Sequence, residues 1–211
     1  MRRVLSLSLV FAALLPLASC SGEVSRNAIE LIVEVDTPAG LQTGSSTIEF
    51  VYEAVPKWLP NGGGSSVKTI GDAVVVDLGE GRHLYALLNA GADGKEVSWL
   101  NHPLRLANDG TITDKSLLPM LVTFTDEADP SSIVEVQADD LRSAFGPGYN
   151  LRKIRAVPSA RQPTREALDS IPLFRDTIFK MSREQPVGGS GDGLRNRPYV
   201  TPGSFRLGKK P

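Results

Sequence analysis

The chain has 211 residues, of which 41% are hydrophobic and 22% are charged, proportions typical of a globular protein. Its only cysteine, Cys20, excludes an intramolecular disulfide, and no stretch after it approaches the roughly 18 apolar residues that would span a bilayer. The net charge of −1 hides two opposed halves, because residues 20–149 contain 8 basic and 19 acidic residues, whereas residues 150–211 contain 13 basic and 5 acidic residues.

The first twenty residues have the pattern of an export signal. Two arginines at positions 2–3 precede an apolar run over residues 4–15, which is too short for a spanning helix, and small residues follow before a cut site. The sequence Leu17-Ala18-Ser19-Cys20 resembles the lipobox of bacterial lipoproteins, in which the cysteine is acylated and becomes the mature N-terminus. The resemblance implies a lipid anchor on Cys20, and Ser21 implies the outer membrane, facing the periplasm. In the alternative interpretation, the signal is an ordinary secretory one and Cys20 is incidental.

Beyond the signal, the apolar residues repeat with a period of two, which predicts strands rather than helices. Residues 28–36 and 47–55 alternate apolar with acidic side chains, with Ile32 as an interruption, and the proline, two glycines and two serines between them predict the turn of a hairpin. A second hairpin is expected around Gly79-Glu80-Gly81. The remaining strands are predicted at residues 67–70, 73–78, 83–89, 97–100, 120–125, 133–136 and 151–157, with a turn at 92–95.

Two short helical segments are predicted near the end of this region. The first spans residues 139–145, with Asp139 as N-cap and Gly146 in the left-handed C′ position. The second spans residues 164–181, is interrupted by Pro172, and would turn Leu168 inward over a sheet edge. The predicted fold class is therefore mainly β: an antiparallel β-sandwich or partly open barrel with one or two short helices.

These patterns divide the chain into five parts. We expect a lipoprotein signal peptide (1–19), an anchor and linker (20–27), a β-rich domain (28–158), a short helical segment (159–182) and a flexible basic tail (183–211).

Motifs for catalysis and metal binding are weak. The chain has two histidines, His83 and His102, and no G-x-S-x-G elbow, so we predict no catalytic residues and no cofactor. The loop around Gly110 fails the EF-hand frame, and we predict no metal site. Asp126, Glu127 and Asp129 are expected in a solvated turn. The alternative is an envelope hydrolase that uses Asp126 or Asp129 with His102.

Trp58 follows a strand and precedes the glycine-rich stretch at 61–66, where a strand rather than the helix of a phosphate-binding loop is expected next. An exposed tryptophan there would suit contact with a partner or sugar. The alternative, favoured by the pattern alone, is a core plug that closes the end of the sandwich. Trp99, inside a predicted strand, is expected in the core.

The basic tail from residue 183 has few large apolar residues, so we expect it to be flexible. Its cations could bind an anionic envelope polymer or an acidic protein, or they could neutralise the acidic body of their own chain. Nucleic acid is not expected as a partner, because the signal removes the chain from the cytoplasm. The predicted partner-binding cations are Arg195, Arg197, Arg206, Lys209 and Lys210.

A second resemblance covers most of residues 29–157. The segments Val35-Asp36-Thr37-Pro38, 43–46, 118–124 and 145–148 are similar to an uncharacterised group of proteobacterial proteins, which carries no activity over to this chain. The function expected from the sequence is a membrane-anchored periplasmic lipoprotein with a non-enzymatic binding or envelope-assembly role. The alternatives are an envelope hydrolase and a small-ligand carrier with a cavity between its sheets.

Overall fold

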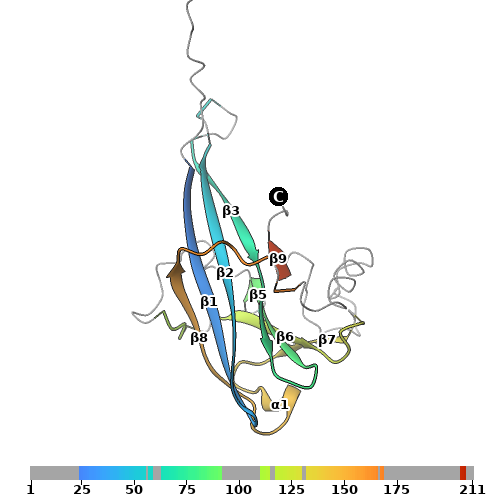
Figure 1. The fold of residues 1–211 in the computed structure, drawn as a ribbon. Coiled ribbons are helices and arrows are strands. Elements are labelled where there is room, and N and C mark those ends of the chain that lie inside the picture. The colour runs from blue at the N-terminus through green and yellow to red at the C-terminus, as the bar shows by residue number, and fades with distance from the viewer. Residues whose placement is uncertain are drawn as a thin grey trace, which may run out of the picture.

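The structure is a computed structural model that describes residues 24–55, 57–58, 63–91, 110–114, 117–129, 132–165, 167–168 and 205–207. It confirms the predicted fold class, because the described residues form two antiparallel sheets with one short helix (Figure 1). The strands are β1 (Val24–Thr37), β2 (Gly40–Ala54), β3 (Ser65–Asp72), β4 (Val74–Asp77), β5 (His83–Gly91), β6 (Pro119–Phe124), β7 (Ile133–Val136), β8 (Asn150–Ser159) and β9 (Arg206–Leu207).

The larger sheet has the strand order β8-β1-β2-β3-β9, and the smaller has the order β4-β5-β6-β7. Both predicted hairpins form: β1 pairs with β2, and β4 pairs with β5 around the glycine-containing turn. Between β3 and β4 a single residue, Ala73, takes the chain from one sheet to the other. The arrangement agrees with the sandwich alternative of the predicted fold class.

The turn of the first hairpin is tighter than the sequence pattern predicted. Thr37 pairs with Gly40 across Pro38 and Ala39, and the Thr37 hydroxyl donates a hydrogen bond to the Gly40 carbonyl at 2.8 Å. The following glycine and serines, predicted in the turn, instead lie within β2. Gly44 is there because the two sheets approach closely: a Cβ atom at this position would lie 2.1 Å from the carbonyl oxygen of Val75.

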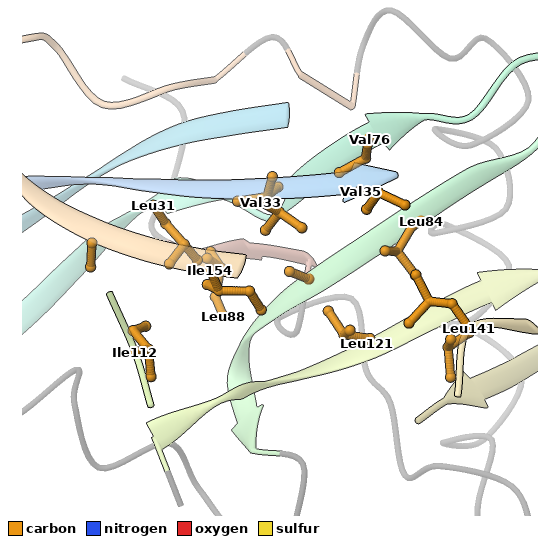
Figure 2. Close-up of a cluster of buried hydrophobic side chains, with 14 of the residues drawn as sticks. Leu31, Val33, Val35, Val76, Leu84, Leu88, Ile112, Leu121, Leu141 and Ile154 are labelled. Carbon is orange, nitrogen blue, oxygen red and sulfur yellow. The ribbon is translucent and has the colours of Figure 1, made fainter. Parts of the chain in front are cut away.

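A hydrophobic cluster fills the space between the sheets (Figure 2). Dense packing of Ile48, Phe50, Val74 and Leu87 would argue against a ligand cavity between the sheets. The first three are completely buried in this cluster, whereas Leu87 is buried in a second cluster on the other face of the smaller sheet. Such burial contributes about 1.5–3 kcal/mol for each large apolar side chain. The other large members include Leu31, Val33, Val35, Val76, Leu84, Leu88, Leu121, Val136 and Ile154.

The smaller sheet is buried on its other face as well. There Tyr85, Leu87 and Val122 pack in a second cluster with Leu168 and Phe205, which come from far along the chain. Two buried faces explain why residues 84–88 are continuously apolar, since a strand that is covered on both sides needs no alternation. The inward position predicted for Leu168 is confirmed.

The first predicted helix forms, but it begins later than expected. The α1 helix spans Arg142–Phe145 and its N-cap is Leu141, without a side-chain cap, so the assignment of Asp139 as N-cap was wrong. Asp140 accepts the Ser143 backbone N–H at 3.3 Å instead. Gly146 ends the helix as its C-cap, with a φ of 97° but a ψ of −179°, so it does not adopt the left-handed helical C′ conformation that was predicted. Its N–H donates to the Arg142 carbonyl at 2.8 Å.

Several predicted elements lie outside the described residues, namely the turn at 92–95, the strand at 97–100 with Trp99, and most of the second helical segment. Of that segment, residues 164–165 and 167–168 are described, and they are not helical. Thr164 instead exchanges hydrogen bonds with Thr47: its N–H donates to the Thr47 carbonyl at 2.9 Å, and its hydroxyl accepts the Thr47 N–H at 2.8 Å. Taken over all the described ranges, the structure contains no helix with the length and apolar character needed to span a membrane.

Candidate functional site

Strands β1, β2 and β3 extend past the sandwich as a projecting arm (Figure 1). We define the arm as the described residues 24–27, 53–55, 57–58 and 63–68. Apart from half-buried Val55, its residues of described exposure are all exposed, although their backbones continue the sheet. At the tip, Val55 exchanges backbone hydrogen bonds of 2.9 and 3.1 Å with Gly64 and Gly63, which close the connection between β2 and β3.

Trp58 lies at the tip of this arm and is 81% exposed, so the core-plug interpretation was wrong. The reason is geometric: β2 runs on to Ala54, beyond the sandwich, and no core remains within reach of the residues that follow. Tryptophan is enriched at contact sites, because its ring is apolar while its indole N–H can stay hydrated. The other exposed large hydrophobic residues in the described part of the chain are Leu41, Val67 and Val134.

The arm also differs in charge from the rest of the fold. It carries Arg26, Lys57 and Lys68 against a single acid, Glu53, whereas the remaining described residues contain 8 cations and 14 anions. Lys57 lies next to Trp58 at the tip, whereas Arg26 and Lys68 are level with Val51 at the base of the arm, where Arg26 lies 3.1 Å from Glu49. The arm is therefore cationic and aromatic on an otherwise acidic body, a combination suited to an anionic surface.

Several basic residues of the C-terminal half form ion pairs with acidic residues of the N-terminal half. Strand β8 pairs with β1, and this pairing places Arg155 3.0 Å and Lys153 3.7 Å from the Glu34 carboxylate. Arg152 lies 2.7 Å from Asp36. These cations belong to β8, outside the tail for which neutralisation of the acidic body was considered.

Arg206, predicted to bind a partner, makes the same kind of contact. Its guanidinium pairs in a bidentate way with Asp72, at 2.6 Å from Nε to Oδ1 and 2.7 Å from Nη2 to Oδ2, and it donates to the Arg165 carbonyl at 2.8 Å. The Asp72 side chain is completely buried. Arg206 is thus paired within its own chain, as in the alternative in which tail cations neutralise the acidic body, and we do not carry it forward as a partner-binding residue.

The C-terminal segment, residues 205–207, is also not part of a flexible tail. Phe205 is completely buried against Tyr85 and Phe124, with ring centroids 5.9 and 6.1 Å away, and its carbonyl accepts the Ala73 N–H at 2.6 Å. The alternation of Phe205 and Leu207 around Arg206 was the available signal for a strand, and the basic residues around it masked that signal. The predicted residues Cys20, Arg195, Arg197, Lys209 and Lys210 lie outside the described residues.

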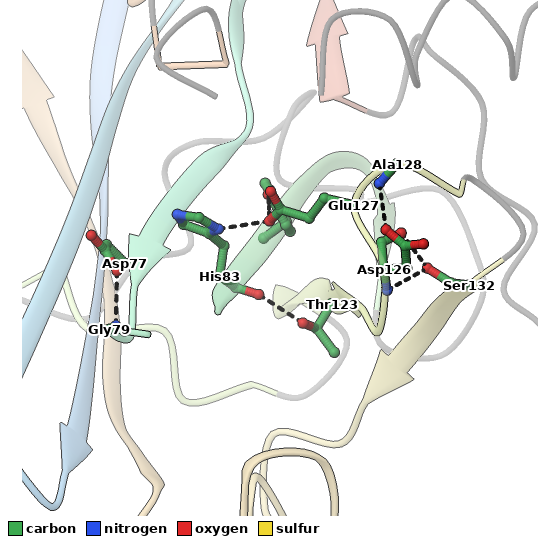
Figure 3. A network of polar contacts seen from close by, with 9 residues as sticks. Asp77, Gly79, His83, Thr123, Asp126, Glu127, Ala128 and Ser132 are labelled. Atoms are coloured by element: carbon green, nitrogen blue, oxygen red, sulfur yellow. Dashed lines mark hydrogen bonds and ion pairs between the residues drawn. The ribbon is translucent and has the colours of Figure 1, made fainter. Parts of the chain in front are cut away.

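A polar cluster that the sequence did not predict joins β5 to the turn between β6 and β7 (Figure 3). His83 Nδ1 lies 2.6 Å from Glu127 Oε1, and the Tyr85 hydroxyl donates to the same oxygen at 2.7 Å. The hydrogen bond to Glu127 raises the pKa of His83 above 6.5, against the opposing effect of burial. Burial tends to raise the pKa of Glu127, but the hydrogen bonds from His83 and Tyr85 outweigh it and lower the pKa below 4.5.

This cluster positions an imidazole without supplying a nucleophile. Among the described residues no hydroxyl or thiol is hydrogen-bonded to His83 Nε2, so the arrangement falls short of a triad. Asp126 and Asp129 lie in the exposed turn that was predicted, and Glu127 differs because it is half-buried. His102, the partner in the hydrolase alternative, is not among the described residues, and within these no group of three or more ligating side chains could hold a metal ion.

Comparisons of the chain with protein-family models, curated proteins and solved structures gave no match. The candidate site therefore rests on the geometry of this chain. Among the residues described, the arm is the surface that combines an exposed aromatic side chain with a distinctive charge.

Proposed function

We propose that the protein is a lipid-anchored protein of the cell envelope, held at the outer membrane through Cys20 and facing the periplasm, with a non-enzymatic binding or assembly role. One observation supports this proposal most directly. Strand β1 begins at Val24, only four residues after Cys20, and Val24 pairs with Glu53 near the tip of the arm. A lipid on Cys20 would therefore be attached at the arm.

This attachment would orient the rest of the molecule. The 14 residues of β1 span about 45 Å at the usual rise of a strand. The arm would lie next to the membrane, and the opposite turn of the hairpin, at Pro38 and Ala39, would point away from it. The sandwich would be held on a stiff, hydrogen-bonded support rather than on a flexible linker. Such a geometry favours a protein that presents a binding surface at a defined distance from the bilayer.

The anchor is tested by intact mass spectrometry and membrane fractionation of the protein expressed in a two-membrane bacterium. We expect the chain to be cleaved before Cys20, to carry acyl chains, and to sediment with the outer membrane. The Cys20→Ser variant should lose both the added mass and the sedimentation, whereas Ser19→Ala, which keeps a small residue before the cysteine, should retain them. An unmodified wild-type chain would contradict the proposal.

The remaining tail cations, Arg195, Arg197, Lys209 and Lys210, are proposed to bind an anionic envelope polymer or an acidic protein. A deletion from residue 183 would be a poor test, because it would also remove Phe205 and Arg206 from the fold. Changing the four cations to glutamine leaves both in place. In intact cells, crosslinking should then lose a partner that the unchanged chain captures, and the capture should weaken with salt. Equal capture by both chains would exclude the tail as the binding site.

A further inference from the structure

We infer that the tip of the arm is a membrane-contact site, in which Trp58 enters the interfacial region of the same bilayer that holds the anchor. The ligand is the lipid surface itself, with anionic headgroups favoured by the neighbouring cations. This inference rests on the proposed acylation of Cys20, and it adds a second, non-covalent contact.

The chain between Cys20 and the arm is short enough for the anchor and Trp58 to contact the same membrane surface. Cys20 is four residues from Val24, so their Cα atoms can be at most about 14 Å apart. Val24 is paired with Glu53, and Trp58 is five residues beyond Glu53, a distance of at most about 18 Å along the chain. The backbone bonds between Val55 and residues 63–64 keep this connection at the tip of the arm. An anchored Cys20 would thus allow Trp58 to reach the membrane surface without any rearrangement of the sheet.

The side chains of the arm are of the types that interact with a lipid surface. Tryptophan is enriched at the membrane–water interface, because its large ring prefers the apolar side while its indole N–H stays hydrated. Each lysine or arginine near an anionic leaflet adds roughly 1 kcal/mol of attraction. Lys57 adjoins Trp58 at the tip, and Lys68 lies farther from the tip, level with Val51. Arg26 is at the same level as Lys68 but is paired with Glu49 at 3.1 Å, so it contributes less to such attraction. Glu53 is the one acidic residue in the described part of the arm, and the other acidic residues that the structure describes lie on the body.

The described part of the fold leaves the Trp58 side chain accessible to a membrane. Trp58 is 81% exposed, and the arm is exposed on both faces. A single lipid attachment leaves a protein free to rotate about it, whereas a second contact would fix the orientation of the sandwich. The arm would therefore hold the sandwich in one orientation relative to the membrane.

The test uses the acylated protein, reconstituted in phosphatidylethanolamine–phosphatidylglycerol vesicles whose acyl chains are brominated close to the headgroup. Bromine quenches indole fluorescence only at short range, so it reports contact with the bilayer. The emission of Trp58 is obtained as the difference from a Trp58→Phe variant, which removes the contribution of Trp99. We expect this difference signal to be quenched in brominated vesicles and to be protected from a water-soluble quencher.

A matched control places the probe at the other end of the hairpin. Leu41 is 48% exposed beside the Thr37–Gly40 turn, and a Trp58→Phe chain with Leu41→Trp should show no quenching by the brominated lipid. Equal quenching at both positions, or a Trp58 signal that stays open to the water-soluble quencher, would overturn the inference. So would protection of Trp58 in native envelopes but not in vesicles, which would indicate a protein or polymer partner. The mass of the same preparation separates the two proposals, because an unacylated chain would contradict the anchor itself.

Discussion

The two ends of strand β3 have opposite environments. At Ser66–Lys68 the strand belongs to the arm and is exposed on both faces, whereas at Gly71 and Asp72 it is completely covered. The difference comes from a distant part of the chain, because β9 pairs with Gly71 and Asp72 and supplies Arg206. The comparison teaches that burial along a single strand depends on what packs over it, and that the uncovered end is the place to look for an external partner.

The largest effect on stability is expected from removing the ion pair between Arg206 and Asp72 at the covered end of β3. Arg206→Ala would leave the buried Asp72 carboxylate without its cation, at a cost of about 3–5 kcal/mol in the free energy of unfolding. Denaturant unfolding measures this loss. The double variant Arg206→Ala, Asp72→Ala should recover part of the lost free energy of unfolding, because no unpaired charge then remains buried. A loss below about 0.5 kcal/mol, the size usual for surface sites, would contradict the pairing.

The contact between the sheets gives the next largest effect. Gly44→Ala would push a methyl group against the backbone of Val75, where the available distance is 2.1 Å. Overpacking of this kind costs roughly 1–3 kcal/mol, and the sheets would have to separate locally. Gly64→Ala on the arm is a matched control, because no atom lies within 4 Å of a Cβ at that position. Similar unfolding free energies for the two variants would show that Gly44 is not needed for sheet contact.

The His83–Glu127 pair should make stability depend on pH. The raised pKa of His83 means that its contribution is complete below about pH 6.5 and is lost as the pH rises through the folded value. The lowered pKa of Glu127 means that its contribution is present above about pH 4.5 and is lost as the pH falls through the folded value. The stability difference between wild type and His83→Gln should therefore be greatest between these limits. The size should be on the order of 1 kcal/mol, the net contribution of a typical intramolecular hydrogen bond, because the pair is only partly buried.

Equilibrium unfolding of both proteins from pH 4 to 9 measures this difference. A Thr125→Ala variant, in an exposed position of the same turn, is a control that should not change the pH profile. A pH-independent difference between wild type and His83→Gln would contradict the ion pair.

The smallest effect is expected at the uncovered end. Trp58→Ala should change the free energy of unfolding by less than about 0.5 kcal/mol, because the side chain packs against little of the fold. Thermal or denaturant unfolding of the protein free of lipid measures this value. A much larger loss would mean that Trp58 is covered in the folded protein, and it would remove the basis for a membrane contact.

The sequence predicted the strands well where one face of the sheet is buried and the other meets solvent. The alternation of Ile29, Leu31, Val33 and Val35 with polar residues is an example, since a period of two is a direct consequence of the pleat. The sequence was misleading where one residue type can serve two structural roles. Gly44 suggested a turn but permits close contact between sheets, and Asp139 suggested a cap although α1 begins two residues later than an Asp139 cap would require.

The sequence by itself determined the β class of the fold, both hairpins and the opposite charges of the two halves, because these depend on local periodicity and composition. Only the tertiary structure decided which charges meet and which aromatic residues are covered. Arg206 and Asp72 are 134 residues apart, and Glu127 is 44 residues from His83, so no local pattern could pair them. Trp58 and Phe205 are likewise aromatic residues beside basic ones in the sequence. The packing of the chain leaves the first exposed at the arm and buries the second against the smaller sheet.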